Sequence, residues 1–388
     1  MKTANSVLSG YGTTVFEVMS RLAVQHQAIN LGQGFPDDRG LPDLLKAGAD
    51  ALTDGWNQYP PMMGVPDLRK AVADHARRFY GLDVDWQGEV MVTSGATEAL
   101  AACLFGLIEP GDEVVLFEPL YDSYVPIIRR AGGIPKFVTL RPPSWGFTEA
   151  DLAAVFSART KLVLLNNPLN PAAKVFSRDE LELLARFVRD FDCYAVCDEV
   201  YEHLVFDGRP HIPLMALPGM RDRCLRIGSA GKTFSLTGWK VGYVTAAATL
   251  LQPVAKAHQF LVFTTPPNLQ TAVAHGLNMP DAYFSGLAAE MQRRRDRLAR
   301  GLADIGFGVL PADGTYFVVC DIRPLANGMD DASFCEHITV EAGVAAIPVG
   351  AFYVQERVDH CVRFCFAKQD SVLDGAIERL TRHFKASA

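Results

Sequence analysis

The chain has 388 residues, enough for roughly two or three domains that each bury a core without disulfides or metal ions. Hydrophobic residues make up 49% and charged residues 21%, a composition that excludes a disordered or fibrous protein. The 37 Lys and Arg against 44 Asp and Glu give a net charge of −7, so no global positive field attracts nucleic acid or anionic lipid. We therefore expect no nucleic-acid and no membrane partner, and any bound anion must meet locally placed cations.

The longest apolar stretch, residues 99–108, is about half of the ~20 residues that a membrane helix needs. The first residues lack the apolar segment of a signal peptide. The eight cysteines lie mostly in apolar runs, where a thiol behaves as a small hydrophobic side chain. Cys193 and Cys197 are closely spaced, as are Cys361 and Cys365, but no second cluster of ligands accompanies them. We expect buried thiols, no metal site and a cytoplasmic location.

From about residue 89, short β-branched runs alternate with helical patterns, which is typical of a parallel sheet with crossover helices. The clearest strands are expected at residues 89–93, 113–117, 161–165, 194–197 and 224–227. Each is followed by a polar or glycine-rich segment. Because ligands of open α/β sheets bind beyond the carboxyl ends of the strands, we expect these five loops to converge on one crevice.

The sequence pattern changes after Pro280: residues 292–308 are rich in charged side chains and predict a long helix that ends at glycine. Strands are expected at residues 315–321, 344–347 and 361–366, and Ser371 with Asp374 predicts the capped start of a terminal helix. The fold class is therefore α/β, with a mainly parallel, mixed sheet in a large domain flanked by helices and a smaller α+β domain. We place the large domain at residues 31–280 and the small domain at 281–388, joined by an N-terminal arm, residues 1–30.

Two of the loops contain groups suited to an anion or an aldehyde. Residues 94–99 (SGATEA) combine small side chains with a helix start, which lets backbone N–H groups approach a phosphate, although the same pattern also caps ordinary helices. Lys232 stands among small residues, where a lysine with a lowered pKa forms a Schiff base; the alternative is a solvated turn lysine. Lys240 offers a second cation, or else is an exposed lysine at a strand edge.

Three further polar residues follow other strands. Asp198 ends an apolar strand, and a carboxylate in poor solvent suits pairing with a protonated ring nitrogen, unless it is a helix N-cap. Tyr201 can donate a hydrogen bond to a phenolate-like oxygen or simply pack, and Asn170 offers an amide donor or forms an ordinary Asn-Pro turn. The strongest signal is their joint order along the chain, each after its own strand.

In this order the segments resemble the pyridoxal-phosphate (PLP) enzymes of fold type I, specifically the class I/II aminotransferases. The sequence is most similar to the branch that holds the kynurenine, glutamine–phenylpyruvate and methionine aminotransferases. The resemblance spans nearly the whole chain and is carried by NLGQGFPD (30–37), NQY (57–59), DEVY (198–201), GSAGKTFSLTGWKVGY (228–243), AIPVGAFY (346–353) and VRFCFAK (362–368).

The resemblance implies that Lys232 forms the Schiff base with PLP and later shuttles the reaction proton, and that Asp198 keeps the pyridine nitrogen protonated. It implies that Asn170 and Tyr201 bind the ring 3-oxygen and that Tyr121 stacks on the ring. The cofactor phosphate is expected to be held by Ala96, Thr97, Ser229 and Lys240, with Tyr59 reaching it from a partner subunit.

For the substrate, the resemblance implies that Arg363 holds the α-carboxylate bidentately, through two of its guanidinium nitrogens, with help from Asn166 and the backbone of Gly34. Phe16 and Phe263 are expected at the substrate pocket. Phe16 and Thr264 align with a tryptophan and a histidine of the kynurenine enzymes. We therefore expect an aromatic amino acid, methionine or a glutamine-like donor rather than kynurenine.

The predicted activity is transfer of an amino group from an L-amino acid to a 2-oxo acid by a ping-pong mechanism, in a homodimer with shared active sites. One alternative is a carbon–sulfur β-lyase that acts on cysteine S-conjugates or cystathionine with the same residues. The other is a non-catalytic PLP-binding regulatory module. The sequence argues against it, because all candidate catalytic positions are occupied by competent residues.

Overall fold

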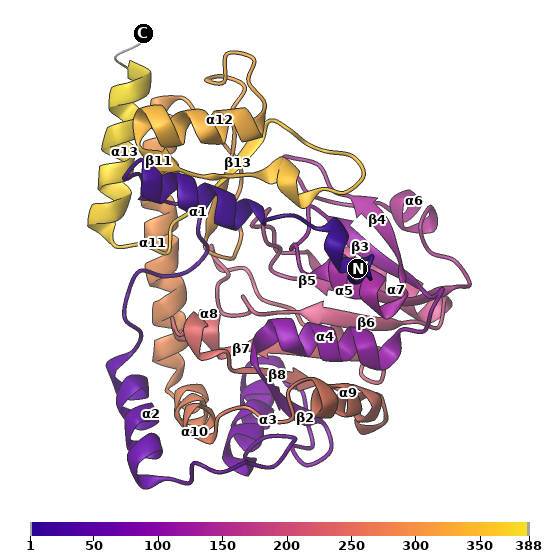
Figure 1. Ribbon diagram of the computed structural model, residues 1–388. Helices are drawn as coiled ribbons and strands as arrows, with labels where there is room; N and C mark the ends of the chain where they lie inside the picture. The colour runs from indigo at the N-terminus through magenta and orange to yellow at the C-terminus, as the bar shows by residue number, and fades with distance from the viewer. Residues whose placement is uncertain (1, 386–388) are drawn as a thin grey trace.

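The computed structural model describes residues 2–385. It contains a seven-stranded sheet with helices on both faces, and a separate four-stranded sheet built mainly from the last quarter of the chain (Figure 1). The seven strands lie in the order β2-β8-β7-β6-β5-β3-β4. Only β8 runs antiparallel to its neighbours β2 and β7, and the remaining pairs are parallel. Two antiparallel pairings in series give β2 the direction of β7, so six strands end at the same edge of the sheet. This confirms the predicted α/β class and mixed sheet.

The strands of the large sheet are β2 (Val90–Thr93), β3 (Glu113–Glu118), β4 (Ile134–Thr139), β5 (Thr160–Asn166), β6 (Tyr194–Asp198), β7 (Cys224–Ser229) and β8 (Gly242–Thr245). The remaining strands are β1 (Ile29–Asn30), β9 (Gly308–Val309), β10 (Phe317–Asp321), β11 (Val344–Ala345), β12 (Ile347–Pro348) and β13 (Cys361–Cys365). The helices are α1 (Val15–Gln25), α2 (Pro42–Asp54), α3 (Pro66–Tyr80), α4 (Gly95–Leu107), α5 (Tyr124–Ala131), α6 (Glu149–Ala153), α7 (Arg178–Asp190), α8 (Ala230–Thr233), α9 (Ala248–Leu261), α10 (Pro267–Leu277), α11 (Asp281–Ile305), α12 (Asp331–His337) and α13 (Asp370–Lys385).

The large sheet is buried on both faces, which explains why its strands are continuous apolar runs. Along β3, Val115 and Phe117 enter one core, whereas Val114 and Leu116 enter the other. Helices α3, α7 and α10 contribute to the first core, and helices α4, α5 and α9 contribute to the second. The five expected strands are therefore present, each within a few residues of its expected limits.

Strands β4 and β8 were not among the clear predictions, and both have a physical reason for a weak signal. β4 is the edge strand next to β3, and it contains Pro135, which cannot donate to a ladder hydrogen bond. β8 begins at Gly242, directly after the loop of Lys240, and is the only antiparallel strand of the sheet. Edge position and reversed direction both fall outside the alternating strand–helix pattern.

The C-terminal part is organised around α11 and the sheet β12-β13-β10-β9. Helix α11 ends as expected, with Gly306 in the left-handed conformation at φ +117°. The expected strand at 344–347 is divided at Ala346: β11 pairs with β1, and β12 pairs with β13. Helix α13 begins at Asp370, so Ser371 lies inside its first turn and the prediction that Ser371 precedes the helix was wrong.

The N-terminal segment packs on this C-terminal part, as Figure 1 shows for α1 beside β11. Met19 and Leu31 belong to the core cluster that holds most of the buried residues beyond 290. All eight cysteines are buried and free, which confirms the buried thiols expected from the sequence. Within residues 2–385, no helix is long and apolar enough to cross a membrane.

Candidate active site

A cavity of about 350 Å³ lies at the carboxyl edge of the large sheet, where the five predicted loops meet. Tyr59 and Phe263 are the two predicted site residues that do not line it. The other thirteen do: Phe16, Gly34, Ala96, Thr97, Tyr121, Asn166, Asn170, Asp198, Tyr201, Ser229, Lys232, Lys240 and Arg363. Loops that are far apart in sequence are therefore brought together as expected.

The start of α4 forms one end of the cavity. Gly95 has φ +76°, and a Cβ built on it would lie 3.3 Å from Nζ of Lys240, so the ammonium group lies against the first turn of the helix. Ser229 accepts a hydrogen bond from the backbone N–H of Gly231 (3.2 Å) and keeps its own hydroxyl proton to donate. No salt bridge joins Lys240 to a carboxylate in the described chain. A helix N-terminus, a hydroxyl and an ammonium group together suit a phosphate.

Lys232 lies in the short helix α8, directly after β7. Burial lowers the pKa of its amine to about 8, because the charged form loses its hydration. The Nζ atom donates a hydrogen bond to the hydroxyl of Tyr316 at 2.7 Å. An amine that loses its proton near neutral pH, held at a fixed position in a cavity, is a competent nucleophile and base.

Asp198 is the last residue of β6 and is buried. Burial raises the pKa of its carboxyl group, and the hydrogen bond that Tyr124 donates to Oδ2 (2.7 Å) acts in the opposite direction. No helix follows in residues 199–203, so the alternative of a helix N-cap is wrong. Asp198 makes no salt bridge within residues 2–385, which leaves its carboxylate able to pair with a protonated nitrogen of a ligand.

Arg363, on β13, closes the other end of the cavity and is 1% exposed. Its Nη1 donates to Oδ1 of Asn170 (2.7 Å) and its Nη2 donates to the carbonyl of Gly32 (3.0 Å). Its Nε has no hydrogen-bond partner among the described residues, and burial lowers the pKa of the guanidinium to about 10. A buried guanidinium without a carboxylate is costly, so this geometry favours a bound anion that accepts from it.

Asn166 has both amide atoms engaged: Nδ2 donates to the carbonyl of Asp198 (2.9 Å) and Oδ1 accepts from the backbone of Asn170 (2.8 Å). It therefore ties the ends of β5 and β6 together at the cavity wall. The amide of Asn170 is also oriented by a hydrogen bond: its Oδ1 accepts from Arg363, and its Nδ2 remains free to donate to a ligand.

Two tyrosines that the sequence analysis did not single out touch the key groups. Tyr124, three residues after Tyr121, holds Asp198. Tyr316 accepts from Lys232 and donates to the carbonyl of Gly34, so one phenol links the lysine to the loop above the cavity. The aromatic loop after β3 gave a partial signal for Tyr124. Tyr316 precedes an apolar strand, where an aromatic residue is expected to serve the core.

Tyr59 and Phe263 lie together at the surface, with ring centroids 5.4 Å apart. Tyr59 is 83% exposed and Phe263 is 41% exposed. Two large aromatic side chains that neither enter the cavity of their own chain nor join its cores are available to another protein surface.

Residues 26–380 match the sequence profile of the family described as aminotransferase class I and II. The chain is 45% identical to a probable N-succinyldiaminopimelate aminotransferase of Mycobacterium tuberculosis, over 97% of each chain, and 41% identical to the methionine aminotransferase of Escherichia coli, also over 97% of each. The solved structure of the E. coli methionine aminotransferase superposes with a TM-score of 0.95 at 40% identity, covering 98% of this chain and 100% of that chain. The solved M. tuberculosis N-succinyldiaminopimelate aminotransferase gives 0.94 at 45% identity, covering 98% and 99%.

Proposed function

The chain belongs to the class I and II aminotransferases and catalyses transamination; from this premise we propose that it uses PLP to move the amino group of an L-amino acid with a large neutral side chain to a 2-oxo acid. The observation that carries the proposal is the placement of Lys232 and Arg363 in one cavity. The buried guanidinium of Arg363 keeps one N–H unpaired, and the amine of Lys232 has a pKa of about 8.

The residues that line the cavity would suit PLP at each of the three places where the cofactor has distinct chemistry. Lys240 and the first turn of α4, with Ala96, Thr97 and Ser229, would hold the phosphate. Asp198 would face the ring nitrogen, Tyr121 the ring plane, and Asn170 and Tyr201 the ring oxygen. Lys232 would meet the aldehyde. PLP, when bound, supplies an electron sink for the negative charge that develops at the substrate α-carbon.

The protein's own groups supply position and proton transfer. Arg363 would orient the amino acid through its α-carboxylate, which fixes the Cα–H bond relative to Lys232. The amine of Lys232 would then take the proton from Cα and return it, and Tyr316 limits where that amine can lie. Asn166 keeps the ends of β5 and β6, and with them Asp198, in register.

The substrate class is supported by what lines the rest of the cavity. Phe16, Phe35, Tyr121 and Phe317 are aromatic, and the cations on the lining are limited to Lys232, Lys240 and Arg363. Each of these three is assigned to the cofactor or the α-carboxylate, so a second substrate carboxylate would have no cation within this chain's cavity. A neutral donor such as methionine or phenylalanine fits better than aspartate or N-succinyldiaminopimelate.

A panel of amino donors against several 2-oxo acids tests this assignment. We expect kcat/KM for methionine or phenylalanine to exceed that for aspartate by about 10²-fold or more, because an unpaired carboxylate is costly to bury. A preference for N-succinyldiaminopimelate would overturn the neutral-substrate proposal. Repeated pyruvate release from a cysteine S-conjugate without any oxo acid would instead favour the β-lyase.

Replacing the lysine tests the cofactor assignment separately. For Lys232→Ala we expect transamination to fall on the order of 10³-fold and the visible absorbance of the lysine-bound cofactor to disappear. Lys46→Ala is the control, because Lys46 lies on the surface and pairs only with Asp50. Unchanged activity and absorbance in Lys232→Ala would show that another group holds the cofactor. Absence of transamination in the wild type would instead favour the non-catalytic PLP-binding module.

A homodimer with shared active sites is part of the same proposal. Trp56, Tyr59 and Phe260 are each more than four-fifths exposed, and Phe263 lies against Tyr59. Large aromatic side chains this exposed support burial against a second copy, from which Tyr59 would reach the phosphate of the neighbouring site. Sedimentation at assay concentration measures this directly, and a fully active monomer would contradict it.

The predicted division into an arm (1–30), a large domain (31–280) and a small domain (281–388) is likewise retained as a proposal. It is supported by the core cluster that joins Met19 and Leu31 to residues beyond 290. A cytoplasmic location is supported by the eight free, buried thiols, which suit a reducing compartment.

A further inference from the structure

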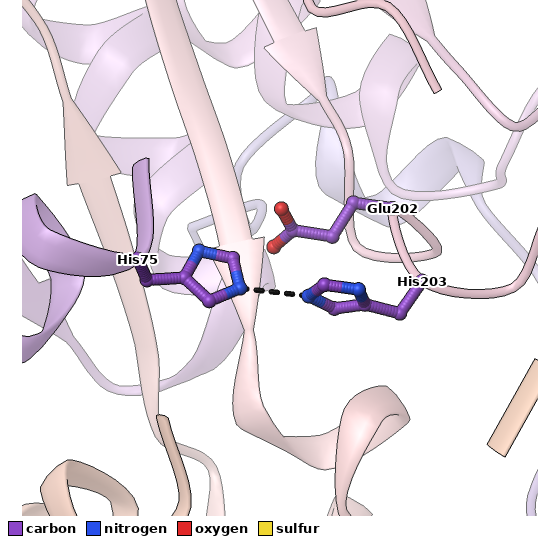
Figure 2. A group of neighbouring side chains, drawn as sticks. All are labelled: His75, Glu202 and His203. Carbon is purple, nitrogen blue, oxygen red and sulfur yellow. Dashed lines mark hydrogen bonds between the residues drawn. The ribbon is translucent and has the colours of Figure 1, made fainter. Parts of the chain in front are cut away.

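Outside the lining of the cavity, two histidines and a glutamate point toward one another (Figure 2). His75 comes from the middle of α3, and Glu202 and His203 come from the turn after β6. The two Nε2 atoms are 2.7 Å apart, and one ligand atom from each of the three residues lies within 4.8 Å of the others. No sequence motif links these positions, since 128 residues separate the two histidines.

Apart from their contact with each other, the two imidazoles make no hydrogen bond within the described chain. In that contact one Nε2 donates to the lone pair of the other, and a metal ion between the rings would bind both Nε2 lone pairs, with the ring protons on Nδ1. Nδ1 of His75 has no hydrogen-bond partner in the described chain. The rings of Phe79 and Phe284 pack on the pair, with centroids 4.8 Å and 4.5 Å from that of His203. This aromatic shell limits the access of solvent to the two rings.

Glu202 supplies a carboxylate that pairs with the guanidinium of Arg226 and still has a free acceptor position. The carboxylate accepts from Tyr80 (2.6 Å), from Tyr243 (3.2 Å) and from Arg226. An ionised carboxylate has about four acceptor positions, so these three donors leave one on Oε1.

The charge balance around the group also favours a cation. Arg226 is buried between two carboxylates, those of Glu199 and Glu202, and His211 pairs with Glu199 at 3.0 Å. Among the described residues, Arg226 is the one guanidinium that pairs with these two carboxylates. A cation bound at Glu202 is attracted by that carboxylate and repelled by Arg226.

We propose that His75, His203 and Glu202 form a binding site for a divalent transition-metal ion of the Zn²⁺ class, with water in the remaining position. Tetrahedral coordination places two ligand nitrogens about 3.3 Å apart, so the imidazoles need to separate by only roughly half an ångström. His203 is only partly buried and gives access from solvent. The bound ion would join α3 to the turn that follows Asp198 and Tyr201, and the proposal does not depend on the cofactor or the substrate.

The test uses the full chain, freed of metal with a chelator and titrated with Co²⁺, whose visible absorbance reports tetrahedral coordination. We expect about one equivalent to bind per chain and Zn²⁺ to displace it. His203→Gln should weaken Co²⁺ binding by about a hundredfold or more, since it removes a direct ligand. His211→Gln is the matched control: it alters a histidine of the same network outside the trio, and its Co²⁺ affinity should stay within about twofold.

The proposal is overturned if the wild-type chain binds no stoichiometric Co²⁺ or Zn²⁺, because the imidazoles would then only share a hydrogen bond. It is also overturned if His203→Gln binds Co²⁺ as tightly as the wild type, which would place the ion elsewhere. Should His203→Gln not fold, His75→Gln gives the same discrimination, and circular dichroism of each variant establishes which of them can be compared.

Discussion

The cavity and the buried network around Arg226 share one short segment, residues 198–203, in which Asp198 and Tyr201 line the cavity and Glu199 and Glu202 pair with Arg226, and their charge balances are opposite. The cavity lining contains three cations, those of Lys232, Lys240 and Arg363, and one carboxylate, that of Asp198. The network instead has two carboxylates for one guanidinium. Because unpaired charge is costly to bury, each excess indicates the sign of what is to be bound there: anions in the cavity and a cation in the network.

The largest effect that would sharpen this comparison is on stability. We expect Arg226→Met to lower the free energy of unfolding by roughly 3–5 kcal/mol, because it leaves Glu199 and Glu202 buried without their cation. Urea unfolding of the cofactor-free protein measures it. The matched variant adds Glu199→Gln and Glu202→Gln to the same change, and should recover much of the loss. A loss below about 1 kcal/mol for Arg226→Met alone would mean that the carboxylates do not depend on it.

Arg363 is the opposite case, a buried cation that has no carboxylate partner in the described chain. For Arg363→Lys we expect kcat/KM for the amino donor to fall roughly 10²-fold, because an ammonium cannot bind a carboxylate through two parallel hydrogen bonds. The stability of the cofactor-free protein should change little, since Arg363 has no carboxylate partner to lose. Arg323→Lys is the control, because Arg323 pairs with Asp321 at the surface. A normal kcat/KM in Arg363→Lys would remove the carboxylate assignment.

The positive excess in the cavity also predicts a pH dependence. Because burial lowers the pKa of Lys232 from 10.5 to about 8, the rate at which the cofactor-free protein captures PLP should rise about tenfold per pH unit up to pH 8 and then level off. The unfolded chain keeps this proton up to about pH 10.5, so it binds more protons than the folded chain between those values. The contribution of Lys232 to stability therefore increases with pH across that window. Stopped-flow absorbance measures the capture rate, and a flat profile from pH 6 to 9 would contradict the prediction.

The smallest expected effect concerns the one carboxylate in the cavity. Tyr124→Phe removes the phenol that donates to Asp198, and we expect roughly a tenfold loss in kcat, in line with one hydrogen bond to a charged group. Because that hydrogen bond favours the ionised form, its loss raises the pKa of Asp198 further, and the acid limb of the kcat profile should move to higher pH. Tyr353→Phe, which loses a phenol hydrogen bond to the carbonyl of Leu140, should move neither quantity.

The sequence predicted those parts of the site that follow a local rule. Asp198 is the last residue of a strand, Lys232 and Asn170 each lie within a few residues of the end of one, and parallel strands bring their carboxyl ends to one edge. Arg363 was reached only through the family resemblance, because one arginine within a strand carries no signal of its own. The structure adds what holds that cation, namely Asn170 and Gly32.

The rest depends on contacts between distant segments. Tyr316 meets Lys232 across 84 residues, and His75 meets His203 across 128. In isolation Tyr316 is an aromatic residue before an apolar strand, His75 lies in an amphipathic helix and His203 in a turn, so composition and periodicity give them no functional role. The network around Arg226 combines residues from α3, β7 and the turn after β6, and no single window of sequence contains it.

The pairing of β1 with β11 constrains the order in which the protein can be completed during synthesis. Leu31 donates to the carbonyl of Ala345 and accepts from the backbone of Cys365, so the loop that contains Gly32 and Gly34 is fixed only by residues made more than 300 positions later. Closing so long a loop has an entropic cost that local contacts do not repay early. A nascent chain on the ribosome can form the large sheet first, but it cannot complete the part of the cavity that holds Arg363 until β13 has emerged. Until then the N-terminal segment, including the apolar face of α1, remains exposed to chaperones and to other nascent chains.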